Sequence, residues 1–103
     1  MALLLVEDAG RRWLVDLGES AEVVLGRGPA ADLPLTAPRA SRRHARVVRE
    51  VDGGHRLEDL GSTNGTLLSG VPVGPAGAPL RDGLVIGVGE CRITYRTPAP
   101  EAI

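Results

Sequence analysis

The sequence predicts an all-β domain, a sandwich of two antiparallel sheets built from short strands. Fourteen glycines and eight prolines in 103 residues interrupt the chain too often for helices of ordinary length. Several segments alternate apolar and polar residues with a period of two, and sequences typical of tight turns lie between them. Together these observations indicate successive hairpins, which pack as an antiparallel sandwich or barrel.

Eight segments are expected to form strands. Residues 91–96 show the pattern clearly, because Cys91, Ile93 and Tyr95 fall on one face and charged or polar residues fall on the other. Residues 11–17 alternate in the same way, so the apolar face of each segment is assigned to the core. The expected strands are residues 2–7, 11–17, 22–25, 44–51, 56–60, 66–68, 84–88 and 91–96.

Length and composition limit the classes of function. A chain of 103 residues fits one domain, expected over residues 1–96, followed by a tail or linker over residues 97–103. The net charge of −1 offers no general attraction for nucleic acid or an anionic membrane, so neither is an expected partner. The lone Cys91 excludes an intramolecular disulfide and a multi-cysteine metal site. We expect a cytoplasmic protein with no cofactor and no metal.

Three short segments carry the residues suited to binding chemistry. Residues 26–27 and 41–44 lie at the two ends of an irregular stretch, and residues 59–66 lead into a tight turn. Loops that gather at one end of a sandwich would place guanidinium groups, hydroxyls and a side-chain amide together. Such a mixture suits a phosphate monoester, which carries about −1.5 to −2 charges near neutral pH and several strong acceptor oxygens.

The three segments resemble the signature of the forkhead-associated (FHA) domain family, in the family's order and at its intervals. The remainder of residues 3–95 also resembles this family. The resemblance implies an FHA/SMAD-like β-sandwich of about eleven short strands with binding loops at one end. The matching segments are Gly26-Arg27, Ser41-x-x-His44 and Asp59-x-x-Ser62-x-Asn64-Gly65-Thr66.

The same resemblance implies a role for each motif residue. Arg27 and Ser41 bind the phosphate, and Arg42 and Thr63 assist them. Asn64 holds the peptide main chain, a task that suits an amide because it donates and accepts hydrogen bonds at once. Arg39 is expected to be an auxiliary contact, and the structural members of the motif are Gly26, His44, Asp59, Gly65 and Thr66.

The function implied by this resemblance is recognition of phosphothreonine without catalysis. The domain would recruit a protein marked by a Ser/Thr kinase, and the partner would be a kinase substrate, the kinase itself or another segment of the same polypeptide. Family members prefer phosphothreonine because a small apolar pocket accepts its methyl group.

Two other functions remain open on the sequence alone. An enzyme would assemble Ser41, His44 and Asp59 as a hydrolytic triad, but residues three apart in a strand project to opposite faces, which argues against it. A module that binds or oligomerises without phosphate, as part of a larger protein, would use the same loops or a sheet face. The presence of Arg27 and Ser41 favours dependence on phosphate.

Overall fold

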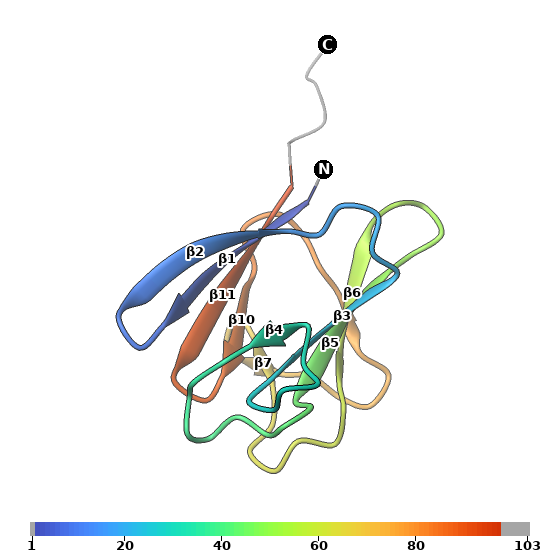
Figure 1. Ribbon diagram of the computed structural model, residues 1–103. Helices are drawn as coiled ribbons and strands as arrows, with labels where there is room; N and C mark the ends of the chain where they lie inside the picture. Colours follow the sequence, from blue (N-terminus) through green and yellow to red (C-terminus); the bar gives the residue numbers. More distant parts are fainter. Residues whose placement is uncertain (1, 98–103) are drawn as a thin grey trace.

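The computed structural model describes residues 2–97, and this range contains eleven β-strands and no helix. The strands form two sheets that face each other (Figure 1). Sheet A has the order β2-β1-β11-β10-β7-β8 and sheet B has the order β4-β3-β5-β6-β9. The strands are β1 (Leu3–Asp8), β2 (Arg11–Asp16), β3 (Glu22–Gly26), β4 (Leu33–Pro34), β5 (Ala45–Arg49), β6 (His55–Asp59), β7 (Leu67–Leu68), β8 (Val71–Pro72), β9 (Ala78–Pro79), β10 (Val85–Val88) and β11 (Cys91–Arg96).

The predicted two-sheet β-sandwich is confirmed, including its eleven strands. All eight strands expected from the pattern are present. The three that the pattern did not reveal, β4, β8 and β9, are two residues long, and a period of two cannot be recognised over that length. The pair β3–β4 is parallel, whereas the other strand pairs are antiparallel.

The core is aliphatic, as the composition predicts. Leu4, Leu25, Leu57, Ile86 and Ile93 have no exposed surface and lie between the two sheets. The alternation expected in β11 is present, because its inward side chains are buried while its other residues are not. On β2 only Trp13 and Val15 are partly buried against this core and the other side chains are exposed, because β2 is an outer strand of sheet A.

No helix within residues 2–97 is long and apolar enough to cross a membrane. The tail expected over residues 97–103 lies outside the described residues, apart from Thr97. The backbone N–H of Thr97 donates to the Asp82 carboxylate at 2.9 Å, which fixes the point where β11 ends.

A two-residue turn joins β1 to β2. Ala9 and Gly10 both have positive φ angles, 53° and 79°, the combination required in a type I′ hairpin turn. This backbone suits glycine, but a Cβ atom in the left-handed region costs roughly 1–2 kcal/mol. Ala9 therefore carries local strain in an exposed turn.

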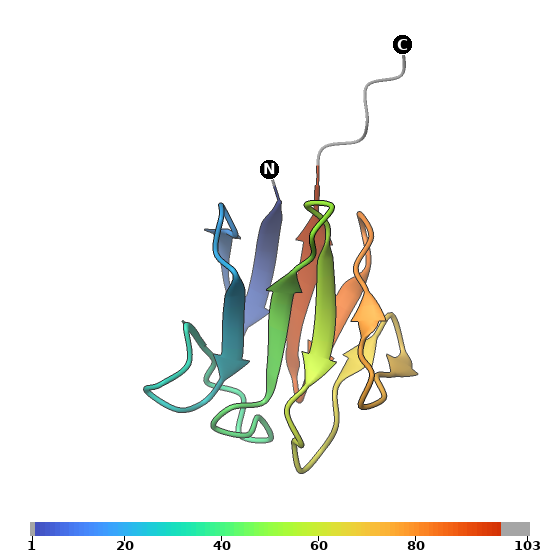
Figure 2. The same ribbon diagram turned by 90° about the vertical axis from the view of Figure 1, so that its right-hand side faces the viewer.

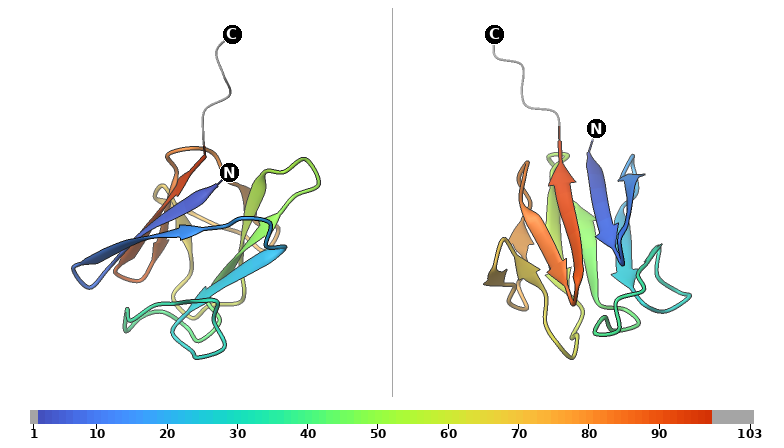
Figure 3. Two further views of the ribbon diagram at one scale, coloured as in Figure 1. Left: turned by 45° about the horizontal axis from the view of Figure 1, so that its top comes forward. Right: turned by 90° about the vertical axis from the view of Figure 1, so that its left-hand side faces the viewer.

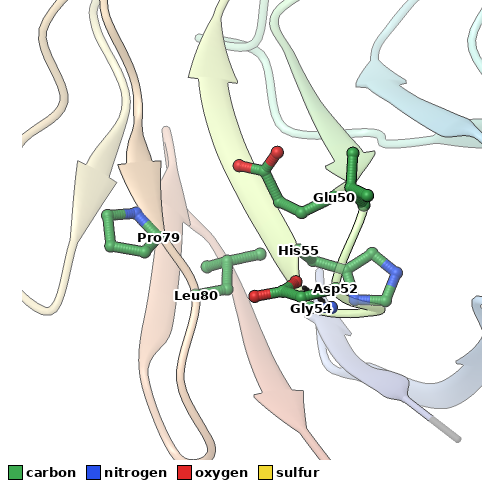
Figure 4. Close-up of a pocket in the computed structure, with 7 residues that line it drawn as sticks. Glu50, Asp52, Gly54, His55, Pro79 and Leu80 are labelled. Carbon is green, nitrogen blue, oxygen red and sulfur yellow. Dashed lines mark hydrogen bonds between the residues drawn. The ribbon is translucent and has the colours of Figure 1, made fainter.

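His55, at the start of β6, is a buried histidine with one ring nitrogen that has no partner in the described residues. His55 Nδ1 lies 2.8 Å from the Tyr95 hydroxyl, and the two rings pack edge to face with centroids 5.6 Å apart. Within the described residues His55 Nε2 is buried and has no partner. Burial, assisted by the charge of Arg49, lowers the pKa of His55. A cavity of about 470 Å³ adjoins it (Figure 4), lined by Glu50, Val51, Asp52, Gly54, His55, Pro79 and Leu80.

Replacing Ala9 with Asn is expected to stabilise the domain by about 0.5–1 kcal/mol, because Asn adopts the left-handed conformation at lower cost. The measurement is the free energy of unfolding in urea. Ala76→Asn is the matched control, since Ala76 is exposed and is not among the residues with positive φ. Equal stabilities for the Ala9→Asn protein and the unchanged protein would contradict the turn assignment.

The free energy of unfolding is expected to fall as pH drops below 6.5, the ordinary histidine pKa. Because the pKa of His55 is lowered in the folded state, the unfolded chain binds the proton first, and stability is lost down to the folded pKa. Urea titrations at a series of pH values measure this slope. His55→Gln should flatten it, and an identical slope in both proteins would rule out His55 as its source.

Candidate functional site

Three loops meet at the end of the sandwich opposite to the start of β1 and the end of β11 (Figures 1 and 2). They are the site loops, residues 27–32 between β3 and β4, residues 35–44 between β4 and β5, and residues 60–66 between β6 and β7. Each site residue expected from the sequence lies in these loops or at the end of an adjoining strand. The structure therefore gathers at one end residues that are far apart in the sequence.

Gly26 allows two of these loops to approach backbone against backbone. A Cβ atom at this position would overlap the carbonyl group of Arg42 and would lie 2.9 Å from the carbonyl oxygen of Ser41. The adjoining N–H of Arg27 donates to the Ser41 carbonyl at 2.9 Å, and that of Gly28 donates to the Arg42 carbonyl at 3.2 Å. A side chain at position 26 would separate these hydrogen-bonded segments.

Three arginines of the site loops, Arg27, Arg42 and Arg43, are exposed and form no salt bridge within the described residues. Arg27 Nε donates to the Ala40 carbonyl at 3.1 Å, which orients the guanidinium group and leaves its terminal nitrogens available. Six salt bridges join side chains of residues 2–97, and none involves Arg27, Arg42 or Arg43. The loops thus carry three arginines that form no salt bridge with a carboxylate of residues 2–97.

Ser41 presents a hydroxyl group with a free proton. The backbone N–H of Thr63 donates to Ser41 Oγ at 3.1 Å, so this oxygen acts as an acceptor toward the protein. Its own proton remains available to a ligand. Thr63 is exposed, and its hydroxyl adds a second donor beside the first.

His44 joins the loops from within. It has no exposed surface, and its Nδ1 accepts a hydrogen bond of 3.0 Å from the backbone N–H of Ser41. Because a backbone N–H can only donate, Nε2 must carry the ring proton, which it donates to the Gly65 carbonyl at 2.8 Å. The main chain of His44 adds bonds to the Leu25 carbonyl and the Leu60 N–H. A single residue thereby fixes β3 and two site loops.

Asp59 organises the loop of residues 60–66 through hydrogen bonds within that loop. Its carboxylate accepts hydrogen bonds from the backbone N–H groups of Gly61 and Ser62, both at 3.0 Å. It also accepts from the Ser62 hydroxyl at 2.5 Å and the Thr66 hydroxyl at 2.6 Å. Burial alone raises the pKa of Asp59, but the hydrogen bonds from Ser62, Thr66 and Gly61 outweigh it and hold this pKa below its ordinary value of 3.8. The carboxylate is therefore ionised and fully engaged.

Asn64 is held in place with part of its amide unused. Its Nδ2 donates to the Arg39 carbonyl at 3.0 Å, whereas Oδ1 has no partner in residues 2–97. Arg39, expected as an auxiliary contact, directs its Nε toward the Glu90 carboxylate at 3.6 Å. A cavity of about 260 Å³ lies beside Asn64, lined by Arg39, Asn64, Gly65, Leu67, Gly87, Gly89 and Glu90.

Two acidic residues at the site were missed from the sequence. Asp8 is buried and accepts hydrogen bonds from the Thr36 N–H at 2.8 Å and the Thr36 hydroxyl at 3.0 Å, so it ties a site loop to sheet A. Its place after Leu4 and Val6 on the inward face of β1 was a usable signal. Glu90 gave no such signal, because its contact with Arg39 arises only when the β10–β11 turn packs next to the loop of residues 35–44.

The hydrolytic triad is not assembled. Both ring nitrogens of His44 contact backbone groups, so neither reaches Ser41 Oγ, and Asp59 binds Ser62 and Thr66 instead of His44. Residues 2–97 also contain no cluster of three His, Cys, Asp or Glu side chains able to hold a metal ion. What the site offers is a set of hydrogen-bond donors around unpaired positive charge.

Replacing Gly26 with Ala is expected to destabilise the domain by about 1–3 kcal/mol, because the added Cβ forces the two backbones apart. Urea denaturation gives the loss, and amide chemical shifts of Ser41 and Arg42 should move with it. Gly74→Ala is the matched control, since a Cβ there meets open space. Equal stability of the two variants would contradict the close approach.

Comparisons with known proteins agree with this geometry. The model of the FHA domain family matches residues 23–89. The oxoglutarate dehydrogenase inhibitor of Corynebacterium jeikeium (strain K411) is 35% identical over 104 residues, which cover 98% of this chain and 68% of that protein. This chain spans 56% to 68% of the length of such curated relatives.

Solved structures show the same fold. A domain from a structural and functional analysis of phosphothreonine-dependent FHA domain interactions superposes with a TM-score of 0.79 at 31% identity, over 96% of this chain and 98% of that chain. The FhaA FHA domain, crystallised in complex with the intracellular domain of Rv3910, gives a TM-score of 0.78 at 32% identity, over 93% of this chain and 100% of that chain. The chain belongs to the FHA domain family, as its sequence motifs predict.

Proposed function

We propose that the site loops bind a phosphothreonine in a partner protein. The observation that carries this proposal is the free positive charge of Arg27 and Arg42 beside the unused proton of the Ser41 hydroxyl. Asp32 and Asp59, which lie in and beside these loops, already accept hydrogen bonds from backbone N–H groups. The ligand that suits this end is therefore an anion rich in acceptor oxygens.

The chemistry of a phosphate monoester supports these assignments. Arg27 and Arg42 supply charged donors, and Ser41 and Thr63 supply neutral ones. Each hydrogen bond to a charged group contributes roughly 1.5–3 kcal/mol net, so two or three of them separate a phosphorylated peptide from the unmodified one by orders of magnitude. A small interface is then sufficient for selectivity.

Asn64 serves the peptide main chain in this proposal. Its free Oδ1 accepts from a peptide N–H, and its remaining amide hydrogen donates to a peptide carbonyl. The cavity beside it, between Arg39 and Glu90, would receive a side chain that follows the phosphothreonine. The preference for phosphothreonine is supported by the phosphothreonine-dependent interactions described for the similar FHA domain.

The wider role is recruitment in Ser/Thr kinase signalling. The similar FhaA domain forms a complex with the intracellular domain of another protein, which supports protein recognition by this chain as well. We assign the binding domain to residues 1–96 and a tail or linker to residues 97–103. The relatives carry names of inhibitors and regulators, which supports a non-enzymatic role.

Fluorescence titration with a degenerate phosphothreonine peptide library tests the proposal. Binding near the micromolar range, about −8 kcal/mol, is expected for phosphothreonine, weaker binding for phosphoserine and none for unmodified peptides. Arg27→Ala and Ser41→Ala should each weaken binding by about 10- to 100-fold, because each removes a hydrogen bond to the phosphate.

Arg49→Ala is the matched control, because Arg49 is an exposed arginine at the other end of β5. Thermal unfolding confirms that each variant is folded. If Arg27→Ala and Arg49→Ala bind equally well, the site assignment is wrong. If folded protein binds no phosphorylated library, the remaining function is phosphate-independent association.

A further inference from the structure

The outer strands of the two sheets differ in whether another strand can join them. Three of the four, β4, β8 and β9, are two residues long, and each contains a proline, namely Pro34, Pro72 or Pro79. Proline has no N–H group to donate to a neighbouring strand. Short edge strands and edge prolines are both common protections against pairing with another chain. In the described structure β2 is the exception, with six residues and no proline.

The free edge of β2 carries backbone groups without partners. Leu17 N–H bonds the Ala2 carbonyl at 3.0 Å, so the odd-numbered residues of β2 direct their backbone groups toward β1. The N–H and C=O groups of Arg12, Leu14 and Asp16 consequently point away from the sheet. These three residues are exposed, and β2 lies at the outer side of sheet A (Figure 3).

The side chains of this edge form a self-complementary pattern. Leu14 is 62% exposed on the outer face of sheet A, next to Leu5 on β1. Arg12 and Asp16 lie two residues before and after it on the same face and carry opposite charges. If two such strands run antiparallel with Leu14 opposite Leu14, each Arg12 lies opposite an Asp16.

We propose that β2 pairs with β2 of a second copy of this chain, antiparallel and with the twofold axis at Leu14. In this register the outward backbone groups of Arg12, Leu14 and Asp16 bond their counterparts. The two Leu14 side chains meet, and they extend an apolar row that begins at Leu5 in each copy. Two Arg12–Asp16 ion pairs flank this row.

Neighbouring registers lose this match. Centring the pair on Trp13 places Arg12 opposite Leu14 and leaves Asp16 without a charged partner. Centring it on Val15 places Leu14 opposite Asp16. Slipping one strand by a single residue would place core-facing side chains of one copy opposite outward-facing side chains of the other. Opposite charges and apolar contact therefore select one register.

The pairing has a geometric consequence for the proposed phosphothreonine sites. Antiparallel β2 strands point the site loops of the two copies in opposite directions, so a dimer would hold two phosphorylated partners apart and not clamp a single short peptide. This step depends on the proposed function, whereas the pairing itself does not.

Sedimentation velocity over protein concentrations from about 10 μM to about 1 mM tests the pairing without any ligand. A concentration-dependent dimer is expected. Leu14→Lys places two positive charges at the axis and should leave only monomer. Val71→Lys is the matched control, since Val71 is 65% exposed on the opposite outer strand of the same sheet, and it should dimerise normally.

A charge swap tests the register. Arg12→Asp should weaken the dimer about tenfold, because two like-charged pairs replace two ion pairs. The double variant Arg12→Asp with Asp16→Arg restores opposite charges and should recover most of the affinity. Arg12 also contacts Glu7 at 3.5 Å and Asp16 accepts from the Gly18 N–H, so thermal unfolding is measured for each variant to confirm the fold.

Cross-linking gives a second readout of the axis. Leu14→Cys should form a disulfide-linked dimer under mild oxidation, and Val51→Cys, which is more exposed than position 14 but lies in the β5–β6 turn, should not. The native Cys91 does not interfere, because it is buried and burial, with Asp8 and Glu7 nearby, raises the pKa of its thiol to about 12. A monomer throughout the concentration range, or a dimer that survives Leu14→Lys, overturns the proposal.

Discussion

The buried imidazole of His44 is the interaction on which the site depends. It accepts a hydrogen bond from the Ser41 N–H on one side and donates one to the Gly65 carbonyl on the other, so it fixes the distance between two site loops. Because both ring nitrogens are committed and the ring has no exposed surface, His44 cannot serve as a base. A Ser-x-x-His spacing that resembles a nucleophile and its base is, in this fold, a structural support.

Backbone contacts hold the site loops close to each other. The backbone groups of Arg27, Ser41 and Arg42 hold two loops together, and Gly26 provides the space that this approach requires. Within the described residues the terminal guanidinium nitrogens of Arg27 and the hydroxyl proton of Ser41 remain unused. Asp59 adds to this support, because its carboxylate accepts hydrogen bonds from donors of residues 61–66 that would otherwise lack protein partners. The loops are thus held mainly by backbone groups, and the polar side-chain atoms left over are the ones that the proposed binding uses.

Much of this arrangement could be predicted from the sequence, for reasons that also explain the gaps. Alternation over four or more residues revealed strands such as β11, whereas the two-residue strands β4, β8 and β9 leave no period to recognise. Family motifs placed Arg27, Ser41 and Asn64 at one end. The alternation in β1 indicates that Asp8 is buried, but its partner Thr36 lies 28 positions away and is not encoded by any local pattern. Local patterns and motifs can be recognised in a sequence, but contacts between distant segments depend on the topology of the fold.

The charges on β2 show how one edge can be both protected and selective. A strand with no complement to Arg12 and Asp16 would gain no new ion pair beyond the contacts these residues already make with Glu7 and Gly18, and this disfavours random partners although the backbone edge is free. A second copy matches both charges in a single register, since the pattern Arg-x-Leu-x-Asp is its own antiparallel complement. Proline removes donors from the other three edges and gives no such choice. The two kinds of edge are therefore protected differently. Proline disfavours pairing with any strand, whereas the charges of β2 disfavour only strands that lack complementary charges.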